Sequence, residues 1–161
     1  MDVFQAMNKR QSIRSFKGEP IEQEDIEKIV EAARIAPSAR NIQPWKLIVV
    51  QDPNLLEDLV EVCKGQEFVK DCGAFVIGLI EDSKWAEVDL SIAMDHLCLE
   101  AVELGYGTCW IGAFDKKKLR DLIDIPEKYE SLVCMTIGLP DEEPRSPTKK
   151  STDELVEWIR V

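Results

Sequence analysis

The sequence predicts an α+β fold in which helices cover both faces of a central sheet. Two observations lead to this prediction: short apolar runs of strand length alternate with segments of helical periodicity, and 45% of the 161 residues are hydrophobic, enough for one core. The charged fraction of 32% is typical of a folded domain rather than of a disordered chain. We therefore expect a single domain over residues 1–161, with a C-terminal arm over about 140–161.

Two helices are predicted before the first strand. Residues 2–9 form the first helix, and the second begins near Glu22, after Pro20, and ends before Pro37. The second helix repeats four apolar residues at helical spacing: Ile26, Ile29, Val30 and Ala33.

Two apolar runs are predicted to be strands. WKLIVV over 45–50 is closed by the turn signal Asp52-Pro53, and a short helix over 55–63 follows it. AFVIGLI over 74–80 is apolar at nearly every position, which is typical of a strand buried on both faces.

The strongest helical segment is 88–104, because apolar residues surround most of its circumference. Such a helix lies at the centre of a core or in a subunit interface. The other expected elements are a strand over 108–111, a helix from its cap Asp115 to Ile123, a strand over 132–138, an extended arm over 140–150 and a short helix over 151–160.

Charge and composition exclude several classes of function. The chain has 31 acidic and 20 basic residues, a net charge of −11, which argues against binding to nucleic acid or to a membrane surface. Its start lacks the apolar stretch of a signal peptide, and no apolar run is long enough to span a bilayer. The five cysteines are irregularly spaced, so we expect reduced thiols in a cytoplasmic protein.

Several catalytic motifs are missing from the sequence. His96 is the one histidine, so a multi-histidine metal site is excluded and we expect no metal. The sequence has no GxSxG elbow and no GxxxxGK[ST] phosphate loop. Gly105 and Gly107 begin a GxG, but Trp110 occupies the third glycine position of the dinucleotide fingerprint.

The segment RQSIRSF, residues 10–16, has the pattern of an anion site. In an extended chain Arg10, Ser12 and Arg14 share one side, while Ile13 points to the other. Two guanidinium groups and a hydroxyl are suited to a phosphate or a carboxylate. The alternative is a solvated basic loop, which is the commoner explanation of an isolated R-x-S-x-R.

A second polar segment, APSARNIQPW over residues 36–45, connects a helix to a strand. Prolines stiffen it, and it contains Ser38, Arg40, Asn41 and Gln43. Amide side chains carry both donors and acceptors, as do the heterocycles that they bind. An ordinary connection with Trp45 as a core anchor explains the segment equally well.

Taken together and in this order, these segments resemble the nitroreductase family of FMN-dependent oxidoreductases. The resemblance continues through DCGAFVIGLI, EAVELGYGTCWIGAFD and IGLPDEEP, and covers nearly the whole chain. It implies the nitroreductase fold, a mixed central sheet flanked by helices. It also implies an obligate homodimer with FMN at the interface, in which the helix over 88–104 buries its second face against the partner.

The resemblance implies which residues hold the FMN phosphate and ribityl chain. Arg10, Ser12 and Arg14 match the family's positions for this role. Lys149 and Lys150 lie where the family places further phosphate cations, and either of them can be the match.

The resemblance also implies which residues surround the flavin ring. Three residues match the loop that reaches the ring from the other subunit: Pro37, Ser38 and Asn41. Ala39 stands where the family often has a second serine. Ile111 and Gly112 match a strand whose backbone approaches the reactive edge, and Gln66 lies near a position of a ring- or ribityl-binding amide.

The implied activity passes electrons from NADH or NADPH through FMN to a nitroaromatic, a quinone or a similar acceptor by a ping-pong mechanism. No catalytic side chain is required, because the flavin carries the redox chemistry. Two alternatives stay open: a non-catalytic flavin-binding or partner protein, and a specialised flavin enzyme of the dehalogenase or flavin-fragmenting type.

Overall fold

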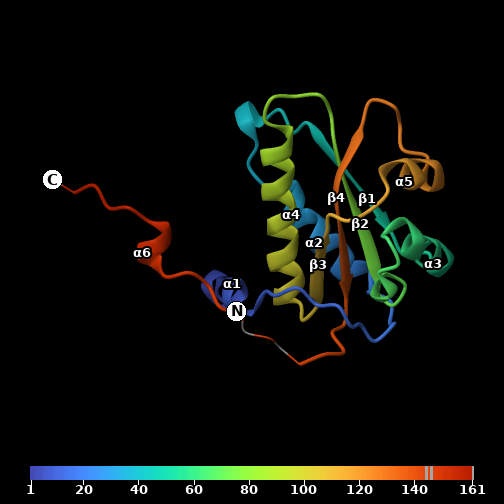
Figure 1. The fold of residues 1–161 in the computed structure, drawn as a ribbon, viewed down its shortest axis with the longest axis horizontal. Coiled ribbons are helices and arrows are strands. Elements are labelled where there is room, and N and C mark those ends of the chain that lie inside the picture. The colour runs from blue at the N-terminus through green and yellow to red at the C-terminus, as the bar shows by residue number, and fades with distance from the viewer. Residues whose placement is uncertain (144, 146, 161) are drawn as a thin grey trace.

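The protein is described by a computed structural model that covers residues 1–143, 145 and 147–160. Its helices flank a twisted sheet, and the C-terminal arm extends away from the body of the molecule (Figure 1). In chain order the elements are α1 (Val3–Lys9), α2 (Gln23–Arg34), η1 (Ala39–Asn41), β1 (Trp45–Val50), α3 (Pro53–Val62), η2 (Glu67–Val69), β2 (Ala74–Ile80), α4 (Ala86–Glu103), β3 (Gly107–Ile111), α5 (Lys116–Ile123), β4 (Glu130–Gly138) and α6 (Thr152–Leu155).

The four strands form one sheet in the order β1-β2-β4-β3, and every neighbouring pair is antiparallel. A single parallel bridge between Ser12 and Thr108 adds the N-terminal segment to the outer edge of β3 and makes the sheet mixed there. The predicted α+β class and the flanking helices are confirmed.

The sheet separates two layers of apolar side chains. On one face β2 contributes Ala74 and Val76 to a core shared with α2 and α4. On the other face its Phe75 and Ile77 pack with α3 and α5. This two-sided burial explains why the sequence of β2 is apolar at nearly every position.

Local capping sets the starts of two helices on the second face. The Asp52 side chain accepts the Asn54 N–H at 2.9 Å, and Pro53 occupies the first position of α3, where its missing N–H costs nothing. The Asp115 carboxylate accepts the Lys117 and Lys118 N–H groups, both at 3.0 Å, at the start of α5. The predicted cap Asp115 is therefore confirmed.

The predicted terminal helix over 151–160 is wrong in extent, because α6 covers only Thr152–Leu155. Described residues beyond it are exposed, Ile159 to 94%, so no packing rewards a longer helix. Pro144, Ser146 and Val161 of the predicted arm lie outside the described residues. In the part of the chain that the structure describes, no helix is long and apolar enough to cross a membrane.

Candidate functional site

The N-terminal segment 10–16 is held between two stretches of chain at the outer edge of β3. On one side the Ile13 N–H donates to the Thr108 carbonyl at 2.9 Å. On the other side the Asp141 N–H donates to the Ser15 carbonyl at 2.9 Å, and Phe16 forms an antiparallel bridge with Pro140. The segment is therefore a fixed part of the sheet edge rather than a solvated loop.

Two glycines let this segment lie so close to the sheet. A Cβ atom on Gly107 would lie 2.5 Å from Cγ1 of Ile13, and one on Gly138 would lie 2.9 Å from Cδ1 of Phe16. Any larger residue at either position would push the segment off the strands. The sequence analysis did not identify the role of either glycine. The feature that indicates it is their position, since Gly107 begins β3 and Gly138 ends β4.

The two arginines of this segment keep their guanidinium groups free. Arg10 is half-buried and Arg14 is exposed, and no described residue forms an ion pair with either of them. Glu142 accepts the backbone N–H of Arg14, but its other oxygen binds the Arg145 guanidinium at 2.8 Å. In a chain with 31 acidic residues, two guanidiniums four positions apart that form no ion pair with described residues are available for an external anion.

The thiol of Cys109, on β3, is buried close to the N-terminal segment. Burial raises the pKa of Cys109, whereas the nearby Arg14 charge acts in the opposite direction. Ile13, between Ser12 and Arg14, is buried, 4% exposed, in the same core cluster as Cys109.

The loop of residues 38–43, between α2 and β1, has an unusual backbone. Arg40, Asn41 and Gln43 have positive φ angles of 55°, 57° and 54°, in the left-handed region that favours glycine. Within the loop the Gln43 N–H donates to the Ser38 hydroxyl oxygen at 3.1 Å, and the Asn41 N–H donates to the Ser38 carbonyl at 3.0 Å. These bonds close the loop on itself.

The loop also connects to the body of the protein through one side chain. The Ala39 N–H donates to a carboxylate oxygen of Asp89, in the first turn of α4, at 2.9 Å. The hydroxyl proton of Ser38 and the amide N–H groups of Asn41 are not used in the loop's internal bonds, since both side chains accept there. The loop therefore offers donors to an acceptor-rich ligand, with Pro37 exposed beside them.

The remaining ring positions lie beyond the N-terminal segment on β3. Ile111 is buried, 1% exposed, and pairs with Cys134 of β4, so its backbone does not face the outer edge of β3 as the resemblance implied. Gly112 is exposed, and a Cβ atom there would meet nothing within 4 Å. Because Thr108 presents its carbonyl to the outer edge and strand residues alternate, the backbone of Trp110 faces the same edge.

Gln66 links two loops of its own chain. Its amide N–H groups donate to the Cys63 carbonyl at 2.9 Å and to the Ala113 carbonyl at 3.3 Å. This leaves the side-chain oxygen of Gln66 as the atom available to a ligand, next to the loop that follows Gly112.

The structure does not bring all predicted residues together in one chain. The 38–43 loop precedes β1 and segment 10–16 lies outside β3, so they are at opposite edges of the sheet, four strand spacings or about 19 Å apart. They also lie toward opposite ends of α4 (Figure 1). Lys149 and Lys150 are exposed on the arm, and no described contact connects them to Arg10 or Arg14.

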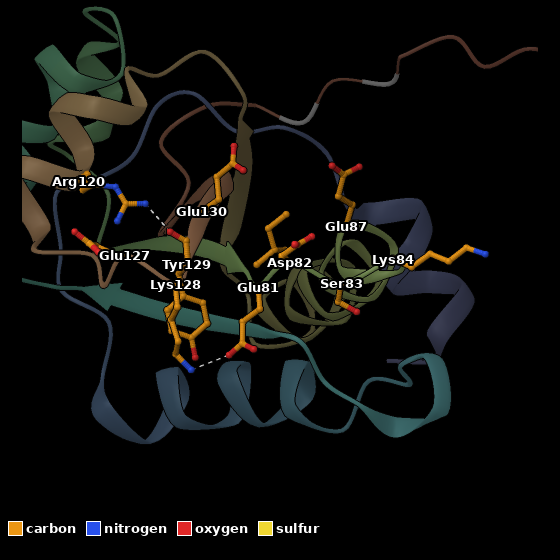
Figure 2. Close-up of a pocket in the computed structure, with 11 residues that line it drawn as sticks. Glu81, Asp82, Ser83, Lys84, Glu87, Arg120, Glu127, Lys128, Tyr129 and Glu130 are labelled. Carbon is orange, nitrogen blue, oxygen red and sulfur yellow. Dashed lines mark hydrogen bonds and ion pairs between the residues drawn. The ribbon is translucent and has the colours of Figure 1, made fainter.

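A cavity of about 710 Å³ contains none of the predicted site residues. It is an open hollow between the β2–α4 connection and the α5–β4 connection, lined mainly by charged side chains (Figure 2). Lys128 pairs with Glu81 at 2.8 Å, and Arg120 donates to backbone carbonyls, so its cations are largely occupied. Among the described residues, no group of three histidine, cysteine, aspartate or glutamate side chains could hold a metal ion.

Comparison with known proteins identifies the family. A model described as the nitroreductase family matches residues 7–82 and 74–139. A protein of Archaeoglobus fulgidus assigned as an NADH dehydrogenase/NAD(P)H nitroreductase is 35% identical over 146 residues, covering 83% of this chain and 83% of that protein. One from Methanothermobacter thermautotrophicus, assigned in the same way, is 34% identical over 154 residues, covering 89% and 80%.

Solved structures agree with this comparison. An FMN-dependent nitroreductase from Clostridium difficile has a TM-score of 0.87 at 29% identity, covering 97% of this chain and 98% of that one. The NADPH:FMN oxidoreductase of Vibrio harveyi, solved with NAD⁺, has the same fold, with a TM-score of 0.90 at 22% identity, covering 99% and 77%. By sequence and by fold, this chain belongs to the nitroreductase family.

Proposed function

We propose that the protein is an FMN-dependent oxidoreductase that takes electrons from NADH or NADPH and delivers them to a nitroaromatic, a quinone or a similar small acceptor by a ping-pong mechanism. The observation that carries this proposal is the pair of free guanidiniums, Arg10 and Arg14, on a rigid sheet edge of an otherwise acidic protein. Relatives whose names include NAD(P)H nitroreductase and FMN-dependent nitroreductase support it.

The residues at this edge fit an FMN phosphate. Arg10, Ser12 and Arg14 supply two cations and a hydroxyl, the donor set that binds phosphate strongly. Their backbone is fixed by the bridge to Thr108, so little conformational entropy is lost when an anion binds. Lys149 or Lys150 can add a further cation if the arm is held near a site.

The groups proposed for the ring differ from those for the phosphate. When bound, FMN supplies the hydride and electron chemistry. The backbone of Trp110 and Gly112 at the edge of β3 offers N–H donors that stabilise negative charge at the ring edge. The Ser38 hydroxyl and the Asn41 amide orient the ring, and the Gln66 oxygen can accept a hydrogen bond from it.

We propose a homodimer with FMN at its interface. Segment 10–16 and the 38–43 loop lie at opposite edges of one sheet, so two copies are needed to bring them to one cofactor. The described surface also exposes many large apolar side chains, which in a soluble protein mark an interaction surface. They lie on α1, near the 38–43 loop, at the start of α4 and on the arm: Val3, Phe4, Met7, Ile35, Ile42, Trp85, Val88, Leu155, Trp158 and Ile159.

We also propose a cytoplasmic location. All five cysteines are free thiols buried in the structure, as expected in a reducing compartment.

The first experiment is the absorption spectrum of the purified protein. We expect a yellow protein that releases FMN on denaturation and oxidises NADH or NADPH when a quinone or a nitroaromatic is present. A colourless protein that also fails to bind added FMN contradicts the cofactor. Bound FMN without turnover points instead to the non-catalytic flavin-binding protein.

The second experiment tests the phosphate site with charge variants. Arg10→Ala and Arg14→Ala should each weaken FMN binding by about tenfold or more, since each removes a charge-assisted hydrogen bond. Lys117→Ala is the matched control, because Lys117 is exposed on α5 and forms no ion pair with described residues. FMN affinity unchanged in both arginine variants would remove segment 10–16 from the site.

A further inference from the structure

The buried carboxylate of Asp89 has no role in the function proposed so far. It lies in the first turn of α4 and is 3% exposed. One carboxylate oxygen accepts the Ala39 N–H at 2.9 Å, and the other is buried without a hydrogen-bond partner among the described residues. Burying a carboxylate costs free energy unless it is well paired, so a carboxylate kept here needs a reason.

The loop that Asp89 contacts adopts a conformation that its own residues do not favour. Three of its residues, Arg40, Asn41 and Gln43, have φ angles between 54° and 57°, and none of them is glycine. Such conformations persist only where the surroundings fix them, and they cluster at functional sites. The bond to Asp89 is the only hydrogen bond that joins residues 38–43 to the rest of the described chain.

We propose that Asp89 is the positioning residue of the 38–43 loop: its carboxylate holds the Ala39 N–H and so fixes the Ser38 hydroxyl and the Asn41 amide in the geometry that the flavin ring requires. The proposal rests on the proposed function, in which this loop reaches the ring. The N-terminus of α4 carries a partial positive charge, which helps to keep a negative side chain at this position.

The location of Asp89 explains why the anchor is a side chain of α4. The loop precedes β1, an edge strand, and it has no neighbouring strand that could hold its Ala39 N–H. The first turn of α4 supplies the missing acceptor from a rigid 18-residue helix. The loop is therefore positioned by the helix core, although its own side chains are largely exposed.

Limited proteolysis tests this anchor without depending on flavin. Trypsin can cleave after the exposed Arg40, in the strained part of the loop. We expect Asp89→Ala to be cleaved at Arg40 about tenfold faster than the wild type, in line with the loss of a hydrogen bond to a charged group. Asp89→Asn keeps an oxygen acceptor for Ala39 and should be cleaved at close to the wild-type rate.

Flavin measurements test the functional part of the proposal. Asp89→Ala should weaken FMN binding and change the visible circular dichroism of the bound flavin, and Asp89→Asn should restore both. Arg40→Gly in the Asp89→Ala background should restore FMN binding in part, because glycine adopts a positive φ without strain. Leu119→Ala, in the core on the opposite face of the sheet, is the control for a general loss of stability.

The outcomes separate this inference from the proposed function. If Asp89→Ala is cleaved at the wild-type rate and binds FMN with wild-type affinity, the inference about Asp89 is overturned and the proposed function is not. The same holds if Leu119→Ala has an equal effect at the same loss of melting temperature. A wild-type protein without FMN overturns the proposed function, while cleavage at Arg40 still decides whether Asp89 is an anchor. If Asp89→Ala does not fold, hydrogen exchange in the wild type decides: an Ala39 N–H that exchanges as fast as the N–H of exposed Arg40, which donates to no described residue, contradicts the anchor.

Discussion

Gly107 is the residue that allows segment 10–16 to lie against the sheet. Its hydrogen leaves room for Ile13, and a Cβ atom would come within 2.5 Å of that side chain. Ile13 is buried, and its N–H bonds to Thr108, so moving Ile13 also moves Ser12 and Arg14. The anion site therefore depends on a residue that contacts no anion.

Gly107→Val should lower the free energy of unfolding by about 1–3 kcal/mol, the usual cost of overpacking a core. It should also weaken FMN binding, because it displaces the segment that carries Arg10 and Arg14. Equilibrium urea unfolding and FMN titration measure the two effects. Gly112→Ala is the control for stability, since a Cβ atom there meets no neighbour within 4 Å. Equal stability of wild type and Gly107→Val would contradict the predicted clash.

Buried thiols make the stability of the fold sensitive to alkaline pH. Burial raises the pKa of Cys63 and of Cys72 to about 12, from the ordinary value of 9.0. Above pH 9 the unfolded chain gains thiolates that the folded chain cannot form. The stabilisation is therefore complete below pH 9 and is lost as the pH rises toward 12, by about 1.4 kcal/mol per pH unit for each thiol.

Urea unfolding near pH 8 and near pH 10 checks this pH dependence. The wild type should lose stability between the two conditions, and Cys63→Ala should lose about 1.4 kcal/mol less, because one titrating thiol is absent. The comparison uses the difference between pH values within each variant, so the packing defect of the alanine cancels. The same loss in both proteins would exclude Cys63 as a contributor.

Helices and strands are predicted well from the sequence where local residue patterns determine their bounds. Strands β1 and β2 begin and end at the predicted residues, because a continuous apolar run and flanking turn signals specify them locally. The positive φ angles at Arg40 and Asn41 could not be predicted, because neither residue is glycine and the anchoring Asp89 lies about fifty positions away. Tertiary contacts also determine which residues of segment 10–16 contact β3.

The same contrast explains the errors at element ends. Helix α6 stops at Leu155, although apolar residues continue at helical spacing, because residues 151–160 are all exposed and no packing stabilises a longer helix. Of the candidate site, the sequence predicted the two segments and their residue types. It could not predict that they lie at opposite edges of the sheet, since strand order is not written in local periodicity.

Helix α5 tests the contribution of a local cap. The Asp115 carboxylate accepts two backbone N–H groups, and the bond from Lys118 is the main reason that its pKa is lowered. Asp115→Ala should lower the free energy of unfolding by about 1 kcal/mol. Asp115→Asn keeps an oxygen acceptor and should lose less. An alanine variant as stable as wild type in urea would show that the cap contributes nothing to the fold.

The whole molecule combines two features that an isolated chain does not explain: a divided cofactor site and exposed apolar side chains. Segment 10–16 is at one edge of the sheet and the 38–43 loop is at the other. Phe4 on α1 is 73% exposed, and Ile159 on the arm is 94% exposed. A second copy of the chain would cover the apolar side chains and complete the site in one step, so dimerisation and FMN binding should be linked.

Phe4→Glu and Ile159→Glu test this linkage, because each places a charge on a proposed contact surface without disturbing the core. In sedimentation experiments we expect the wild type to be a dimer and each variant to dissociate at higher protein concentration. FMN binding should weaken in the same order as dimerisation, since the two copies share the cofactor. Lys117→Glu, on an exposed face of α5, is the matched control and should change neither property. A monomeric wild type that binds FMN tightly would contradict the dimer and require all cofactor contacts to come from segment 10–16 and the edge of β3 in one chain.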